Sequence, residues 1–168
     1  GTLTERIRDT DTSGDLLGRL AVSGAGLARA VIDGIEAGEL VPVAQPEDGV
    51  SHAAKITTDD AHVRWDLPSH LIGRSVRAHT PAPGAWAMLG DARVKLGAVT
   101  PVDGDDNVPA GLAPGVLGVT KKAVFVGTAS GAVRLSTVQA PGKKSMNAGS
   151  CSSSSANSST ITTSAGSG

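Results

Sequence analysis

Residues 81–99, PAPGAWAMLGDARVKLGAV, decide the fold class of this chain of 168 residues. Pro-Ala-Pro-Gly makes a rigid turn, and short strands are expected directly after it. Gly90-Asp91 is a two-residue hairpin signal, because glycine reaches the positive φ that the first position of a type II′ turn requires. Alternation and turn residues place the strands at 85–89, 92–99, 115–120, 123–128 and 132–138. Five short strands indicate a small barrel or sandwich.

Helical patterns precede these strands. Thr12 is an N-cap candidate with Asp15 three residues later, and two helices are expected to follow, interrupted at Gly24 and Gly26 and ending at Gly38. A further helix is expected from Pro68 to just before Pro81.

Two other segments frame these helices. Residues 2–7 alternate like a half-exposed strand, and residues 39–58, with three helix-breaking prolines and glycines, are expected to form a linker. The whole pattern is that of a mixed α+β chain with one helix leading into the strands.

The composition limits the possible chemistry. Aromatic residues make up 2% of the chain, with one Phe and two Trp, so aromatic stacking cannot be its main means of binding. A single cysteine excludes an intramolecular disulfide and a cysteine-based zinc cage, and it fits a reduced, cytoplasmic setting. No metal is therefore expected. We find no apolar run of membrane-spanning length and no secretion leader, so no membrane is expected as a partner.

Charge divides the chain into two halves. Residues 1–50 hold four basic against nine acidic side chains, a net charge of −5, and residues 51–144 hold eleven basic against seven acidic, a net charge of +4. Such asymmetry indicates that the second half faces a polyanion.

Catalytic motifs are weak by comparison. The four histidines, at 52, 62, 70 and 79, match no zinc-ligand spacing, and Cys151 lies in a low-complexity stretch that cannot hold it beside a base. The carboxylates of residues 103–106 lack the bidentate glutamate of a calcium loop and are expected to lie in a solvated turn.

Dispersed cations are the more informative feature. They lie in the half with the positive balance, as a protein that contacts a nucleic-acid backbone requires, and an oligonucleotide-binding-type barrel often presents such a surface. The set comprises Lys55, Arg74, Arg77, Lys121, Lys122, Lys143 and Lys144. The competing interpretation is an ordinary solvated surface.

Seven stretches, taken in order, resemble methionyl-tRNA formyltransferases over about residues 1–148. They are Asp-Thr-Ser-Gly at 11–14, residues 38–43, His-Ala-Ala-Lys-Ile at 52–56, Ala-His-Val-Arg-Trp at 61–65, residues 72–76, Arg-Ala-His-Thr-Pro-Ala-Pro-Gly-Ala-Trp at 77–86, and Ala-Pro-Gly-Lys-Lys at 140–144. Their order and spacing carry the resemblance.

The resemblance implies a domain organisation. Residues 1–40 would be the last strand and helices of an α/β Rossmann-like formyltransferase domain, residues 41–58 a linker, and residues 59–148 an oligonucleotide-binding-type β-barrel that docks tRNA. Residues 149–168 are rich in serine and depart from the family; they are expected to be disordered or non-native.

The resemblance also implies a function. Family members transfer a formyl group from 10-formyltetrahydrofolate to the amino group of methionyl-initiator tRNA, using an Asn, a His and an Asp that would lie upstream of this chain. No catalytic or cofactor-binding residue is therefore carried over, and the complete protein is expected to be a monomeric cytoplasmic enzyme that does not act on DNA. The family's linker lysine matches Lys55 as a tRNA contact, and Arg77, Lys143 and Lys144 match in residue type.

Two alternatives remain open. The chain could be a free-standing, non-catalytic RNA-binding barrel module, or part of another folate-dependent formyltransferase, such as one that acts on a nucleotide sugar. An upstream reading frame would separate the first alternative from the enzyme, and competition between tRNA and sugar nucleotides would separate the second.

Overall fold

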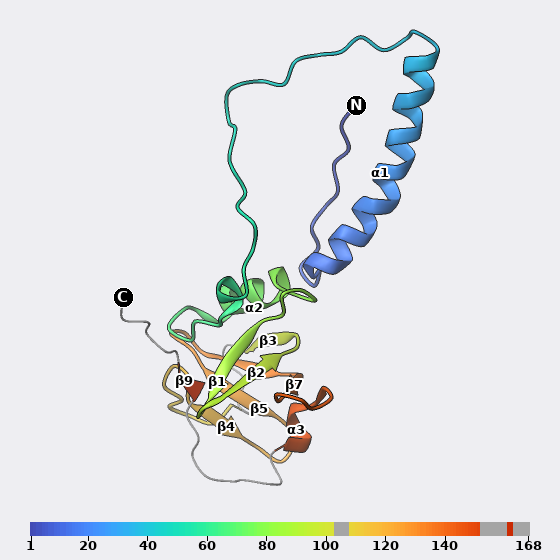
Figure 1. The fold of residues 1–168 in the computed structure, drawn as a ribbon. Helices are drawn as coiled ribbons and strands as arrows, with labels where there is room; N and C mark the ends of the chain where they lie inside the picture. Colours follow the sequence, from blue (N-terminus) through green and yellow to red (C-terminus); the bar gives the residue numbers. More distant parts are fainter. Residues whose placement is uncertain (103–107, 152–160, 163–168) are drawn as a thin grey trace. The chain divides into compact units, whose positions relative to one another are not determined.

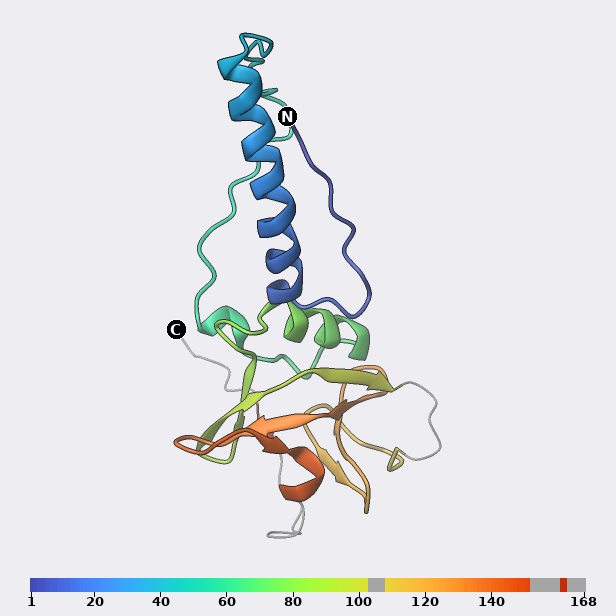
Figure 2. The same ribbon diagram turned by 90° about the vertical axis from the view of Figure 1, so that its right-hand side faces the viewer.

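The computed structural model describes residues 1–102, 108–151 and 161–162, and it divides the chain into two units, Gly1–Ile56 and Thr57–Gly168. The carboxylates of residues 103–106, expected to lie in a solvated turn, belong to residues 103–107, which are outside the described part of the chain. Each unit is described by itself (Figures 1 and 2).

The first unit contains one helix, α1 (Ser13–Glu36). Thr12 caps it as expected: its hydroxyl accepts from the Asp15 backbone N–H, and the Asp15 carboxylate accepts from the Thr12 backbone N–H. Gly38 follows the C-cap at φ +70°, where glycine is favoured, so the predicted end of the helix is confirmed.

Two expectations for this unit are wrong. Residues 2–7 form no strand, because no described strand pairs with them, and a single helix of 24 residues replaces the expected pair of helices. Gly24 and Gly26 do not interrupt α1, since each costs only about 1 kcal/mol in a long, capped helix. Residues 39–56 contain neither helix nor strand.

The second unit begins with a short helix, η1 (Asp59–Ala61), and α2 (Ser69–Ala78), which buries Ile72 and Val76. Its strands are β1 (Trp86–Leu89), β2 (Ala92–Leu96), β3 (Val99–Val102), β4 (Leu117–Val119), β5 (Val124–Gly127), β6 (Ala132–Leu135), β7 (Thr137–Gln139), β8 (Met146–Asn147) and β9 (Ile161–Thr162), with α3 (Ala148–Cys151) after β8. In both views α2 lies over one end of the strands (Figures 1 and 2).

The strands form two antiparallel sheets. Sheet A has the order β8-β7-β2-β1-β9 and sheet B the order β3-β6-β5-β4. The two-residue hairpin between β1 and β2 is confirmed, with Leu89 opposite Ala92 and Gly90 at φ +57°. The mixed α+β class is also confirmed, and hydrogen bonding between the described strands leaves the sheets as two separate, open sheets.

Two expected strands each break into two at a corner between the sheets. The strand expected at 92–99 bends at Gly97, so β2 belongs to sheet A and β3 to sheet B, and the strand expected at 132–138 bends at Ser136 between β6 and β7. The corners touch: Gly97 N–H donates to Thr137 O at 2.9 Å, and Ser136 N–H donates to Ala98 O at 3.3 Å. A Cβ at Gly97 would collide with the Thr137 hydroxyl, so the close approach requires glycine.

One apolar core joins the sheets to α2. It is built almost entirely from valine, leucine, isoleucine and alanine, and its one fully buried ring is Trp65, at 1% exposure. The core residues are Val63, Trp65, Ile72, Val76, Ala85, Ala87, Leu96, Val99, Val124, Val126, Val133, Leu135 and Ala148. Burial of these side chains is the main stabilising contribution to this unit.

Part of the serine-rich segment, residues 149–168, forms short regular elements. Residues 149–151 belong to α3, and Ile161 and Thr162 pair with Leu89 and Met88 at the edge of sheet A. Backbone pairing to an open strand edge needs no apolar side-chain pattern. Residues 152–160 and 163–168, the rest of the segment expected to be disordered or non-native, lie outside the described chain.

Gly127 provides a test of the packing of sheet B. A Cβ there would meet the backbone carbonyl oxygens of Ala113 and of Leu112, the latter at 2.6 Å. Gly127→Ala should therefore lower the free energy of unfolding by about 1–3 kcal/mol, measured by urea denaturation followed through tryptophan fluorescence. Both tryptophans, Trp65 and Trp86, lie in the second unit, so the signal reports on that unit.

Gly26→Ala is the matched control. The same added carbon meets no atom within 4 Å in α1. It should increase helicity and stabilise the helix by about 1 kcal/mol. An unchanged midpoint for Gly127→Ala would show that residues 112–113 move away at no cost.

Candidate nucleic-acid interface

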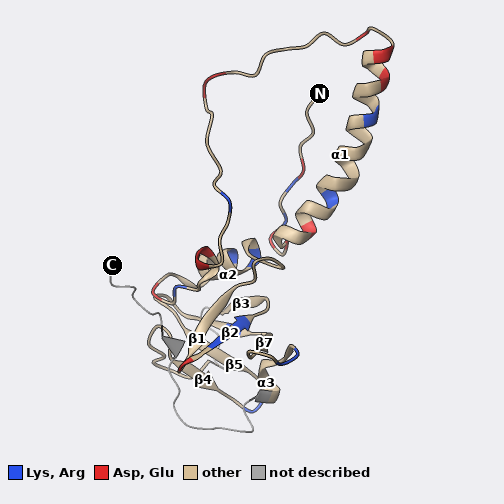
Figure 3. Cartoon of the chain, in the orientation of Figure 1, with Lys and Arg blue, Asp and Glu red and all other residues tan. Residues whose placement is uncertain are grey.

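Most cations of the second unit have no carboxylate partner. Arg64 pairs with Asp66 at 2.7 Å, and the other ion pairs of the described chain, formed by Arg19 and Arg29, belong to the first unit. Figure 3 shows blue positions on α2, on β2 and on the connection after β7, among others. Cations without an internal partner are those available to an external anion.

The predicted contact Lys55 lies in the segment of residues 39–56, which has neither helix nor strand, and it is exposed. Among the described residues no hydrogen bond or ion pair to its ammonium group is recorded. It belongs to the first unit, one residue before the division of the chain.

Arg77 is half-buried in the last turn of α2. Its Nη1 atom would lie 3.5 Å from a Cβ on Gly73, so the side chain runs back along its own helix beside Pro101 of β3. Arg74, three residues before Arg77 on the same helix, is exposed. The guanidinium of Arg77 is thus partly occupied in covering the contact between α2 and sheet B.

Lys143 and Lys144 lie on the exposed β7–β8 connection, residues 140–145. The Gln139 side-chain amide donates to Lys143 O at 2.8 Å, and Lys143 N–H donates to Ala140 O at 3.1 Å. These two bonds fix the backbone of the connection as a tight turn beside sheet A.

The sequence analysis missed Arg93 and Lys95 on β2. Val94 packs against the core and Leu96 lies in it, so the two cations point to the opposite, outer face of sheet A, and both are exposed. The alternation Arg-Val-Lys-Leu was the available signal, because residues two apart in a strand share a face.

Trp86, on the same outer face, has both faces of its indole covered. The Arg93 guanidinium carbon lies 4.0 Å from the ring centroid, and the His62 ring stacks at 4.2 Å with 21° between the planes. Two groups this close to one centroid must lie on opposite faces of the ring. The indole Nε1 donates to Thr58 O at 2.7 Å, which ties the start of this unit to β1.

The stack favours the neutral form of His62. Burial, and then the nearby Arg93 charge, lower the pKa of His62, while Asp59 raises it by a smaller amount. Its Nε2 atom is buried and makes no hydrogen bond to a described residue. The ring is therefore a packing element rather than a proton donor or acceptor for catalysis.

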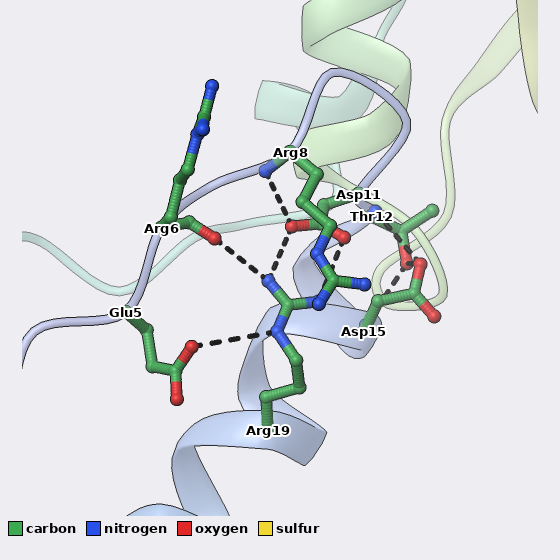
Figure 4. Close-up of polar contacts among 7 residues, drawn as sticks. All are labelled: Glu5, Arg6, Arg8, Asp11, Thr12, Asp15 and Arg19. Atoms are coloured by element: carbon green, nitrogen blue, oxygen red, sulfur yellow. Dashed lines mark hydrogen bonds and ion pairs between the residues drawn. The ribbon is translucent and has the colours of Figure 1, made fainter.

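A second polar cluster, in the first unit, is structural. Arg19 donates from Nη1 to the Asp11 carboxylate at 2.9 Å and from Nη2 to Arg6 O at 3.1 Å, and Glu5 lies 3.8 Å from its Nε (Figure 4). The hydrogen bonds from Arg19 and from the Arg8 backbone lower the pKa of Asp11 to about 2. The Arg19 guanidinium pairs with both Asp11 and Glu5, so the cluster fixes the turn before α1.

The predicted site residues are therefore only partly brought together. Lys143 and Lys144 share sheet A with Arg93 and Lys95, whereas Arg77 packs toward sheet B and Lys55 lies in the other unit. In the described part of the chain no group of three or more histidine, cysteine, aspartate or glutamate side chains could hold a metal ion. None of the described helices has the length and apolarity needed to cross a membrane.

Comparison with known proteins identifies relatives of this chain. Residues 55–155 match the family described as formyl transferase, C-terminal domain. A methionyl-tRNA formyltransferase of Mycolicibacterium vanbaalenii is 60% identical over 148 residues, covering 88% of this chain and 47% of that protein. The enzyme of the same name from Rhodococcus erythropolis is 56% identical over 149 residues, covering 89% of this chain and 47% of that protein. The chain thus spans about half the length of the curated relatives it matches.

Solved structures show the same fold at low identity. A variant of HypX from Aquifex aeolicus superposes with a TM-score of 0.66 at 19% identity, over 89% of this chain and 27% of that one. A structure of HypX in complex with tetrahydrofolic acid superposes with a TM-score of 0.55 at 22% identity, over 72% of this chain and 21% of that one.

The stacked histidine predicts a pH dependence. Because the pKa of His62 in the folded chain lies below its ordinary value, the unfolded chain binds the proton first as pH falls. The free energy of unfolding should therefore be greatest above the ordinary histidine pKa of about 6.5 and decrease below it. In His62→Phe, which keeps a stacked ring, urea denaturation from pH 7 to pH 5 should show a shallower decrease. An equal slope in both proteins would assign the pH dependence to another group.

Proposed function

The chain belongs to the formyl transferase C-terminal domain family, and we propose that it is the C-terminal, tRNA-docking part of a methionyl-tRNA formyltransferase. The complete enzyme transfers a formyl group from 10-formyltetrahydrofolate to the amino group of methionyl-initiator tRNA, in translation initiation. The observation that carries this proposal is the identity of 55–60% to proteins of that name over about nine-tenths of the chain.

Formyl transfer requires a neutral attacking amine, a polarised formyl carbonyl and an in-line arrangement of the two. Among the described residues, His62 is enclosed in a stack, and no cluster of side chains could hold a metal ion. We assign the chemistry and the folate donor to the half of the relatives that this chain does not match, and docking to this chain. HypX, whose fold this chain shares, has been solved with tetrahydrofolic acid, which supports a folate-related donor.

The organisation proposed for the chain follows from the same premise. Residues 1–40 complete the formyltransferase domain, residues 41–58 form the linker between the two domains, and residues 59–148 dock the RNA. The exposed apolar residues of α1 support the first assignment, because no residue of this helix is buried, and Leu17 and Ile35 are 65% and 63% exposed. A face of this kind is stabilised by packing against a domain.

The proposed RNA contacts are Lys55, Arg77, Lys143 and Lys144. Unpaired, exposed ammonium groups at Lys55, Lys143 and Lys144 support phosphate contact. Phosphate contacts would position the aminoacyl end of the tRNA without base readout. The partner is a single tRNA bound by a monomeric enzyme.

The test compares binding with chemistry. The chain of 168 residues should bind fluorescently labelled methionyl-initiator tRNA, measured by anisotropy, and should transfer no formyl group from 10-formyltetrahydrofolate by itself. Displacement of the labelled tRNA by a nucleotide sugar at stoichiometric concentration would favour the other folate-dependent formyltransferase. Failure to bind tRNA at any salt concentration would overturn the docking role.

Lys55 gives a residue-level prediction. If its ammonium contacts a phosphate, Lys55→Gln should weaken tRNA binding and reduce the slope of log affinity against log salt by about one. Arg29→Gln is the control, because Arg29 is an exposed cation that already lies 3.9 Å from the Asp33 carboxylate. Parallel lines for Lys55→Gln and the unmodified protein would return Lys55 to the solvated surface.

A further inference from the structure

The outer face of sheet A carries a continuous row of polar and cationic side chains. Strand pairing places Lys95 directly between Trp86 on β1 and Gln139 on β7, and places Arg93 opposite Met88. Alternation turns all these side chains to the face opposite the core, which is filled instead by Ala87, Leu96 and Val138. Arg93 and Lys95 are about 7 Å apart along the strand, within reach of neighbouring phosphates on one RNA strand.

The row continues into the β7–β8 turn. Gln139, opposite Lys95, holds that turn through its bond to Lys143 O, and the chain after Gln139 runs antiparallel to β2, back toward Arg93. Lys143 and Lys144 therefore lie at the margin of the same face. Blue positions on β2 and on the connection after β7 mark the two parts of the row (Figure 3).

The strands and the turn that carry this row contain no acidic residue. Strands β1, β2, β7 and β8 and residues 140–145 contain no aspartate or glutamate, and the nearest acid in sequence is Asp91, in the hairpin turn. Neither Arg93 nor Lys95 forms an ion pair with any described carboxylate. Four cations that share one side of the sheet and form no ion pair with a described residue create a local positive potential.

Trp86 gives this face a fixed element. Its ring orders the Arg93 guanidinium from one side and rests on His62 on the other, so the arginine is held before any ligand arrives. Because both faces of the indole are covered, no base can stack on it. The face is therefore suited to a phosphate backbone rather than to unpaired bases.

The opposite side of the unit lacks such a row. On sheet B, Arg134 of β6 is exposed between Thr100 and Phe125, and Lys121 and Lys122 are exposed on the β4–β5 connection. Arg74 and Arg77 lie on α2, which packs against β3 and β6 of sheet B. These cations lie on different elements and do not form one continuous row on a single sheet face.

We propose that the outer face of sheet A is the surface through which this domain receives the tRNA, with Arg93 and Lys95 as phosphate contacts continuous with Lys143 and Lys144, and with Trp86 as the positioning residue for Arg93. The proposal rests on the tRNA-docking function and assigns it to one face of the domain.

The test neutralises matched pairs of cations in the chain of 168 residues. Arg93→Gln with Lys95→Gln should reduce the affinity for methionyl-initiator tRNA at least tenfold near 0.1 M salt and lower the log–log salt slope by between one and two. Arg74→Gln with Arg134→Gln, the same number of exposed cations on α2 and sheet B, should change the affinity less than twofold. Circular dichroism checks that both variants are folded.

Equal losses from the two pairs, or a loss from the control pair alone, would overturn the assignment to sheet A while leaving tRNA docking intact. Absence of tRNA binding by the unmodified protein would instead overturn the docking function itself. The two failures are therefore distinguishable.

A double-mutant cycle tests the role of Trp86. Trp86→Phe should weaken tRNA binding several-fold in the unmodified background and have no effect on tRNA affinity when Arg93 is already Gln. An effect of the same size in both backgrounds would show that Trp86 acts through stability alone, and Trp86 would no longer be a positioning residue.

Discussion

The corner at Gly97 is the constraint on which the arrangement of the second unit depends. There the chain passes from sheet A to sheet B, and it does so against Thr137, where a second strand makes the same passage. A side chain at position 97 would separate the two strands. With the corners in contact, β2 pairs with β7, and the Arg93–Lys95 side of β2 joins the Gln139 side of β7 in one outer face.

The core explains why that face is free to carry charge. Valine, leucine and alanine fill the space between the sheets, and Trp65 supplies the largest buried ring, so no side chain of the outer row is needed for burial. Trp86, the other tryptophan, lies outside this core and orders a cation instead. Two residues of the same type thus serve two physical roles, set by the side of the strand or segment on which each lies.

In the proposed enzyme, docking by phosphate contacts matches a domain so poor in exposed aromatic rings. A row of cations positions an RNA strand through its shape and charge, while recognition of the reacting amine belongs to the catalytic half. The exposed apolar positions of α1 point to the same division, since a capped helix with no buried side chain completes its packing on another domain.

Local chemistry in the sequence was sufficient to predict the cap at Thr12, the hairpin at Gly90-Asp91, the α+β class and the strands around residues 85–138, because each depends on neighbours along the chain. The family resemblance could also be found from the sequence alone, because it depends on the order of short motifs along the chain. Only the tertiary structure decided that two strands break at corners, that α1 runs through Gly24 and Gly26, and that Arg93 and Lys95 share a face with the β7–β8 turn. Those features depend on which distant backbone lies alongside, and the spacing of residues in one segment carries no information about that neighbour.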